Sequence, residues 1–209
     1  MTNSRLALAG LFGPPLFGVL VVLATALEWD FLHTLAWSAG PFDSPDAPWP
    51  SIAALGDYGL VVSLAFVLLG LSILALAYVL LRLLAVRRKY GVALLGLFGA
   101  AAALAVIRTD YRTAYGGGPN TWNGTVNAVA FSIFVPAAVV SMLSLAAQFR
   151  RDERWRPLVG RSALAGFAAL VSIVAFLATF ANLFFWIYLA IVLAWLMLVS
   201  ARALSLSPS

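Results

Sequence analysis

The residues that could do chemistry gather near the ends of long apolar segments. Eleven polar residues fall at the expected outer ends of the first four segments: Glu28, Asp30, His33, Asp57, Arg108, Asp110, Tyr111, Arg112, Tyr115, Asn123 and Asn127. Carboxylates and an imidazole are the groups that general acid–base catalysis uses. Asp57, Asp110 and His33 would therefore form an outer-leaflet enzyme site if the chain brought them within hydrogen-bond reach around a cavity.

The same residues could instead bind a ligand. Asn123 and Asn127 are one helical turn apart and share a face. Arg108 and Asp110 flank the end of the preceding apolar segment, so the group could hydrogen-bond a polar headgroup. The predicted ligand-binding candidates are Asp57, Arg108, Asp110, Asn123, Asn127 and His33. A purely structural alternative stays open, in which Asp57 and Asn123 cap helices and Arg108 pairs with Asp110.

Metal and cofactor chemistry finds little support in the sequence. The chain has no cysteine and one histidine, which excludes thiolate sites, multi-histidine zinc sites and a bis-histidine haem built from this chain alone. His33 lies near Glu28 and Asp30 and could bind a metal. A lone histidine near a helix end is more often a hydrogen-bonded interface residue. The sequence therefore predicts no metal, no cofactor and no catalytic residue.

The composition predicts a membrane protein. Of the 209 residues, 63% are hydrophobic and 10% are charged, whereas soluble domains are about half apolar and about a quarter charged. Lipid is the solvent that tolerates this excess. The net charge of +5 comes from basic residues in short loops, which indicates membrane topology and not a nucleic-acid partner.

Six apolar segments have the length of membrane-spanning helices: residues 6–27, 58–81, 91–107, 125–147, 162–181 and 183–201. The first ends in Ala24-Thr25-Ala26, a pattern that also occurs at signal-peptide cleavage sites, but its length favours a membrane helix. The last two need a tight turn at Asn182, the alternative being one long tilted helix. The predicted fold is all-α: a single-domain polytopic bundle of six transmembrane helices.

The loop charges predict the orientation. Eleven of the thirteen lysines and arginines fall on the side of the N-terminus, and six of the eight acidic residues fall on the other. The positive-inside rule then places both termini in the cytoplasm, so the chain is predicted to be a multi-pass protein of a cell membrane. The basic residues of the inner loops should attract anionic lipid; they are Arg87, Arg88, Lys89, Arg150, Arg151, Arg154 and Arg156.

Smaller features predict local structure. Pro50 follows a proline-rich stretch and favours a short interfacial helix. Gly96 with Ala100, and Gly99 with Ala103, are pairs of small residues that favour close helix packing inside the bundle, or a homodimer contact. The serine and threonine hydroxyls within the segments should bond to carbonyls one turn back.

The chain resembles the family of prokaryotic membrane proteins known as domain of unknown function 998. The resemblance covers nearly the whole chain and rests on four motifs: Gly13-Pro14-Pro15-Leu16-Phe17, the stretch from Gly59 through Gly70, Arg108-Thr109-Asp110, and the basic connection from Arg150 to Arg156. It implies six helices and no established activity.

This chain differs from the family in one motif. A His-Gly-x-x-His run often opens the fourth helix in the family, whereas this chain reads Asn123-Gly124-Thr125-Val126-Asn127. Any metal or acid–base role of those histidines therefore cannot be carried over. The position of Asp110 is retained.

Three hypotheses for function follow. No Asp, Glu, Lys, Arg or His lies centrally in any segment, which argues against a proton pump or an ion-coupled carrier. The first hypothesis is a non-enzymatic module that binds a lipid or apolar ligand, or serves as an accessory subunit beside a partner subunit or a second copy. The second is the outer-leaflet enzyme, and the third is a transporter of an uncharged solute, which needs a polar path or a broken helix at the midplane.

Overall fold

The computed structural model describes residues 2–34, 50–109, 121–179 and 182–207. Within these ranges every regular element is a helix. The elements are α1 (Asn3–Leu27), α2 (Trp29–Thr34), η1 (Pro50–Leu55), α3 (Gly59–Leu83), α4 (Tyr90–Leu104), α6 (Trp122–Phe149), η2 (Glu153–Leu158), α7 (Val159–Thr179) and α8 (Asn182–Leu206). The all-α prediction is confirmed for this part of the chain.

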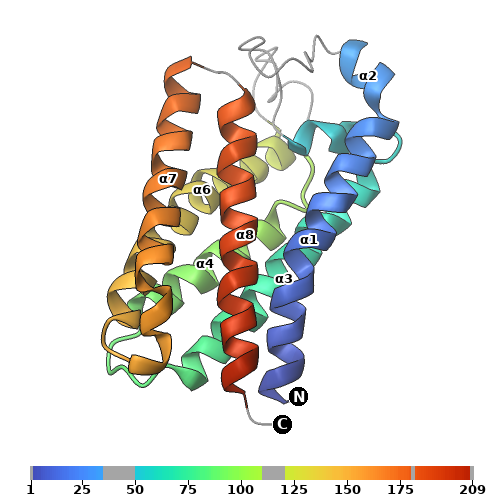
Figure 1. Cartoon of the computed structure of the whole chain (residues 1–209). Coiled ribbons are helices and arrows are strands. Elements are labelled where there is room, and N and C mark those ends of the chain that lie inside the picture. The colour runs from blue at the N-terminus through green and yellow to red at the C-terminus, as the bar shows by residue number, and fades with distance from the viewer. Residues whose placement is uncertain (1, 35–49, 110–120, 180–181, 208–209) are drawn as a thin grey trace.

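The six longer helices form a closed ring. Along the chain, α1 packs against α3, α3 against α4, α4 against α6, α6 against α7 and α7 against α8, and α8 returns to α1. Helix α3 also contacts α8 across the ring. Both chain ends lie at the same end of the bundle (Figure 1), so the chain runs along the bundle an even number of times.

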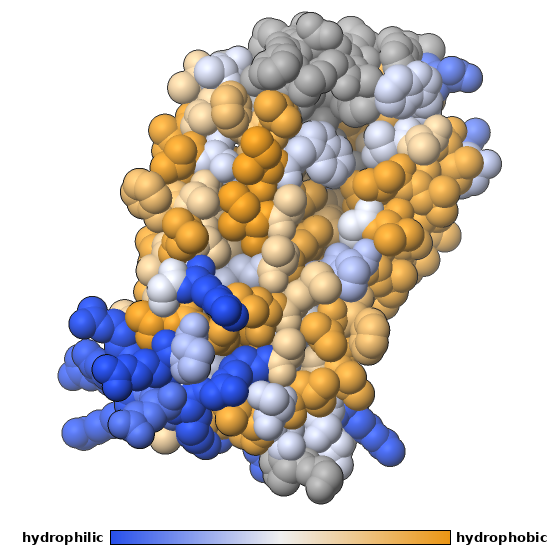
Figure 2. All heavy atoms as spheres, in the orientation of Figure 1, coloured by the Kyte–Doolittle hydropathy of each residue, from blue (hydrophilic) through white to orange (hydrophobic). Residues whose placement is uncertain are grey.

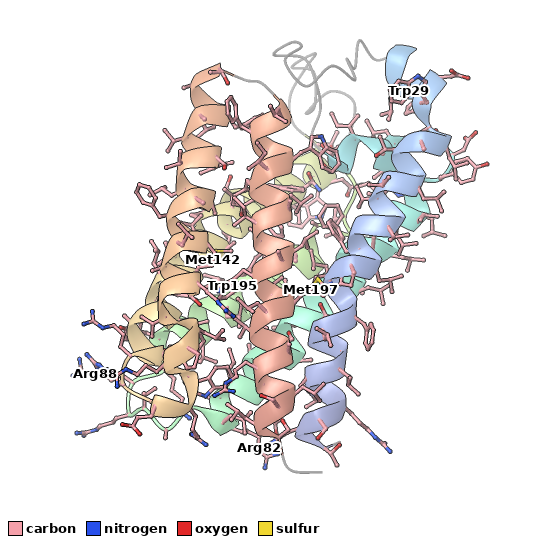
Figure 3. All side chains as sticks on the ribbon, in the orientation of Figure 1. Trp29, Arg82, Arg88, Met142, Trp195 and Met197 are labelled. Atoms are coloured by element: carbon pink, nitrogen blue, oxygen red, sulfur yellow. The ribbon has the colours of Figure 1, made fainter. Side chains whose placement is uncertain are left out.

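Among the described residues, five helical stretches are long and apolar enough to cross a membrane. They are Asn3–Leu27, Gly59–Leu83, Trp122–Phe149, Glu153–Thr179 and Leu183–Leu206. Apolar side chains cover the middle of the visible face, whereas hydrophilic ones gather at the end that carries the termini (Figure 2). Trp29 lies at the opposite end from Arg82 and Arg88 (Figure 3). The protein is therefore built as a multi-pass membrane protein.

The remaining predicted segment, 91–107, which is the third along the chain, is the exception. Its helix α4 has 15 residues, fewer than the other five, and ends in a 3-10-like turn in which Ile107 N–H donates to Leu104 O. Two hydrogen bonds nevertheless tie this segment to both ends of α6. Gln148 Nε2 donates to Arg88 O (3.0 Å), and Asn127 Nδ2 donates to Ile107 O (2.9 Å). At 1.5 Å per residue, the α6 stretch from Asn127 to Gln148 is about 32 Å long.

The short helix after Pro50 and the break near Asn182 are both confirmed. Residues 50–55 form η1. Helix α7 ends at Thr179 and α8 begins at Asn182, so the long apolar run is two helices and not one. The two helices pack side by side, which buries apolar side chains of both.

Small residues allow α3 and α4 to approach closely. A Cβ added at Gly70 would lie 2.5 Å from Ala103 N and 2.7 Å from Gly99 O. The pair Gly99 and Ala103 therefore packs inside the bundle, as predicted. Gly96 differs, because a Cβ there would meet nothing within 4 Å. This glycine faces away from the described neighbours, so its predicted packing role inside the bundle is wrong.

Polar side chains inside the helices mostly bond locally, as predicted. Ser72, Ser141 and Ser172 each donate to a carbonyl three or four residues earlier. Two longer bonds join different helices: Tyr188 Oη donates to Val135 O (3.1 Å), and Trp195 Nε1 donates to Ser162 Oγ (3.0 Å). These bonds fix α8 against α6 and α7.

Candidate ligand-binding site

Among the described residues, the structure places one of the six predicted ligand-binding candidates, Asn127, in the wall of a pocket. Asn127 is buried and its amide nitrogen bonds to Ile107 O. Asp57, Arg108 and Asn123 are exposed. Two predicted site residues cannot be placed: Asp110 lies outside the described residues, and so does the side chain of His33. The convergence of Asp57, Asp110 and His33 that an enzyme would need therefore stays a prediction.

Asp57 does not cap the following helix. The residue at the N-cap of α3 is Tyr58, which makes no side-chain capping bond. The Tyr58 N–H instead donates to the carboxylate of Glu28, which is only 4% exposed. A Cβ added at Gly56 would overlap this carboxylate. A charged acceptor at a helix N-terminus is favourable, so Glu28 holds the end of α1 against the start of α3.

Asn123 is likewise not a cap. It lies inside α6, whose N-cap is Thr121. The Thr121 hydroxyl accepts from Gly124 N–H at 3.2 Å. With the capping role taken by threonine, Asn123 is an exposed residue in the first turn of α6. The alternative that Arg108 pairs with Asp110 involves a residue outside the described part of the chain.

Asn127 lines a pocket of about 400 Å³, which lies among η1, the end of the α4 segment, α6 and α7. This volume is within the usual range of small-molecule sites. Its polar lining residues are Ser51, Thr109, Asn127 and Ser132, and its apolar ones are Ile52, Ala128, Phe131, Val135, Pro136, Ile173 and Leu177. Leu177 is 58% exposed, so the pocket reaches the molecular surface beside α7.

The pocket is polar at one end and apolar at the other. Asn127 is in the second turn of α6, where Ser51 and Thr109 also contribute. Pro136 lies nine residues further along the same helix, about 14 Å away at 1.5 Å per residue. The lining near it includes Val135 on the same helix, and Ser132 lies one turn earlier. Such a gradient matches a molecule with a neutral hydrogen-bonding head and an apolar tail.

Pro136 adds one acceptor to the pocket wall. Helix α6 continues through this proline, which has no N–H to donate to the carbonyl of Ser132 one turn earlier. The Ser132 hydroxyl is not the donor that replaces it, because it donates to Ala128 O at 2.8 Å. The Ser132 backbone carbonyl is therefore left without its usual helical donor, in a residue that lines the pocket.

A second polar cluster lies at the other end of the bundle, and the sequence analysis missed its organisation. Asp152 is 6% exposed and accepts hydrogen bonds from Ala85 N–H (3.0 Å) and from Arg154 N–H (3.1 Å). It also pairs with the Arg154 guanidinium at 2.8 Å. This guanidinium donates to Leu83 O, and Arg202 donates to Arg154 O. The sequence signal for this cluster was the acidic pair Asp152-Glu153 within the basic connection from Arg150 to Arg156.

The electrostatics of Asp152 follow from these contacts. The hydrogen bond from the Arg154 side chain holds the pKa of the Asp152 carboxyl below its ordinary value, against the opposing effect of burial. The bond from Ala85 N–H acts in the same direction. The carboxylate is thus charged and fully used in joining the end of α3 to η2.

Within the described residues, no group of three His, Cys, Asp or Glu side chains could hold a metal ion. No family model, curated protein or solved structure matches the chain. Membership of the family of domain of unknown function 998 therefore stays a prediction, and the function has to be argued from the residues alone.

Proposed function

We propose that this chain is a six-crossing protein of a prokaryotic cell membrane, with both termini in the cytoplasm, that binds a lipid-like molecule without converting it. The sixth crossing would be the α4 segment. Its support is the pair of hydrogen bonds that Arg88 O and Ile107 O accept from Gln148 and Asn127, at the two ends of α6. The stretch of α6 between these two donors is as long as the bilayer core of about 30 Å.

The orientation rests on the basic loops and has a direct test. The chain has no cysteine, so single cysteines can be introduced without removing any. Asp57→Cys and Lys89→Cys lie at opposite ends of α3 in the described structure. We expect an impermeant maleimide to label Asp57→Cys in intact cells and Lys89→Cys only after permeabilisation. Labelling of Lys89→Cys in intact cells would overturn the orientation.

The observation that carries the binding function is the pocket between α6 and α7. Its head end offers hydroxyl and amide groups, which suit an alcohol, ester or amide headgroup. Its apolar end suits an acyl or isoprenoid chain. The proposed ligand is therefore a neutral amphiphile such as an acylglycerol, lying with its polar head toward the outer end of α6.

The test uses a photoreactive monoacylglycerol with a diazirine in its acyl chain. We expect cross-links in the α6 stretch around Phe131 to Pro136 and in α7 around Ile173. Ala128→Phe should fill the pocket and lower cross-linking there at least about tenfold, equivalent to about 1.4 kcal/mol. Ala147→Phe is the matched control, because Ala147 is an exposed alanine of the same helix outside the pocket.

Two outcomes would refute the binding proposal. Cross-links spread evenly over all helices would mean that the probe dissolves in the lipid layer around the protein. Equal cross-linking of the parent and Ala128→Phe at the pocket peptides would mean that the pocket holds no ligand. Either result would favour the accessory-subunit hypothesis. Co-purification of a stoichiometric membrane partner would then support that hypothesis.

A further inference from the structure

We propose that a basic recess at the end of the bundle opposite the outer pocket is a binding site for the phosphate of an acidic phospholipid headgroup. The recess has a volume of about 320 Å³ and is lined by Ala85, Val86, Arg87, Arg88 and Arg151. This proposal rests on the proposed membrane crossing, which puts the recess at the level of the lipid headgroups. It does not depend on ligand binding in the outer pocket.

Two hydrogen bonds shape the recess. The segment from Ala85 to Arg88 connects α3 to α4, and both of its ends are tied to the chain at the end of α6. Ala85 N–H donates to Asp152 Oδ2 (3.0 Å), and Arg88 O accepts from Gln148 Nε2 (3.0 Å). Because the backbone of the segment is held at both ends, it keeps Arg87 and Arg88 in one recess with Arg151.

The charge of the recess is uncompensated within the described structure. The ion pair found among the described residues joins Arg154 to Asp152. Asp152 is therefore already used, and Arg87, Arg88 and Arg151 line the recess without a described carboxylate within ion-pair distance. Three like charges around one space repel one another, and an anion bound among them removes that repulsion.

The chemistry of the lining favours a phosphate. A guanidinium presents a planar fork of N–H donors that matches phosphate oxygens bidentately. Basic pockets between membrane helices on the cytoplasmic side are suited to phospholipid headgroups. Figure 3 shows Arg88 at the end of the bundle that also carries Arg82.

The position favours a lipid over a soluble anion. The recess lies between the last turn of α3 and the first turn of α4, and each turn bears an exposed apolar or aromatic side chain: Leu81 is 48% exposed and Tyr90 is 45% exposed. An acyl chain could cover these side chains while its phosphate occupies the recess. Inorganic phosphate would leave them uncovered.

The test measures binding of dioleoylphosphatidylglycerol to the full chain in zwitterionic detergent by native mass spectrometry, with dioleoylphosphatidylcholine as the reference lipid. The triple variant Arg87→Gln, Arg88→Gln, Arg151→Gln should lower affinity for phosphatidylglycerol by roughly a hundredfold, from about a fivefold factor per charge. Affinity for phosphatidylcholine should not change.

The control variant removes the same charge elsewhere. Arg5→Gln, Arg156→Gln, Arg161→Gln neutralises three exposed arginines that do not line the recess. At physiological salt, exposed charges more than about 8 Å from the bound phosphate are largely screened, so affinity should fall by less than about threefold. Ala128→Phe in the outer pocket should leave phosphatidylglycerol binding unchanged, which separates this proposal from the proposed function.

The remaining arms decide the source of the phosphate and the integrity of the fold. Millimolar inorganic phosphate should not displace the lipid, and complete displacement would overturn the lipid assignment in favour of a soluble anion. Equal losses in the two triple variants would overturn the recess in favour of diffuse surface charge. Replacing the three recess arginines by lysine keeps the charge but loses the planar fork, so its affinity for phosphatidylglycerol should lie between those of the parent and the glutamine variant. Circular dichroism spectra equal to that of the parent show that both variants are folded.

Discussion

Asp152→Ala should be among the most destabilising single changes at the end of the bundle that carries the termini. The carboxylate accepts from Ala85 N–H, from Arg154 N–H, and from the Nε and a terminal nitrogen of the Arg154 side chain. Removing it leaves the end of α3 without its link to η2. The link from Ala85 spans 67 positions of sequence, so no neighbouring residue can replace it.

The magnitude follows from how exposed each donor is. The Arg154 side chain is 47% exposed, so it rehydrates when the partner is removed, and its ion pair contributes about 0 to 1 kcal/mol. The bond from Ala85 is partly buried and ends on a charged acceptor, which places it at about 1.5 to 3 kcal/mol. We therefore expect Asp152→Ala to lower the free energy of unfolding by about 2 to 4 kcal/mol.

The pH dependence provides a second readout. Because the pKa of Asp152 in the folded state is below the ordinary value of 3.8, its stabilising effect is present above that value and is lost as pH falls through the folded pKa. The stability difference between the parent and Asp152→Ala should be constant from about pH 5 to 7 and should shrink below about pH 4.

The assay is reversible unfolding in mixed micelles, followed by circular dichroism as the denaturing detergent fraction rises. The matched control is Glu153→Ala, which removes the adjacent, exposed carboxylate and should change stability by less than about 0.5 kcal/mol. If Asp152→Ala and Glu153→Ala unfolded at the same detergent fraction, the reasoning that Asp152 joins α3 to η2 would be refuted.

Three further predictions, two of them with a control variant, can be measured in the same unfolding assay. Gly70→Ala would push a methyl group into α4 and should cost at least about 1 to 3 kcal/mol, whereas Gly96→Ala meets open space and should be neutral or slightly stabilising. Thr121→Ala removes the cap of α6 and should cost about 1 kcal/mol, whereas Asn123→Ala should change little. Ser162→Ala leaves a buried indole N–H without its acceptor and should cost about 1 to 3 kcal/mol. If Gly96→Ala cost as much as Gly70→Ala, the packing argument would be contradicted. If Asn123→Ala cost as much as Thr121→Ala, the capping argument would be contradicted.

The sequence predicted the helices well because length and hydropathy determine them. Each of the six apolar segments contains a helix, and the ends differ from prediction by a few residues. The ends differ because capping depends on which side chain reaches a free N–H. Thr121 reaches Gly124, so α6 begins before Asn123. At α3 the acceptor is Glu28, which is 30 positions away and therefore invisible to local reasoning.

The candidate site was only partly predictable for the same reason. Asn127 was selected because it lies near the outer end of its segment, and the structure places it in a pocket wall. Ser51, Thr109 and Ile173 join it from three other parts of the chain. No period or motif in the sequence links these residues, because their proximity results from the ring order of the helices. The Asp152 network depends likewise on a contact between segments far apart in sequence.

The two walls of the outer pocket are held differently, and this bears on how a ligand would enter. The α6 wall is fixed by polar bonds, because Asn127 donates to Ile107 O and Val135 O accepts from Tyr188 of α8. Helix α7 contributes Ile173 and Leu177, which are apolar, and its described hydrogen bond to α8 lies near its other end, between Ser162 and Trp195. Moving the pocket end of α7 away from α6 therefore separates apolar side chains but breaks neither of the bonds that hold α6. Lipid tails can fill the gap that opens, because they are as apolar as the side chains themselves. For the ligand proposed above, this arrangement predicts entry sideways from the membrane, between α6 and α7, with α7 as the wall that moves.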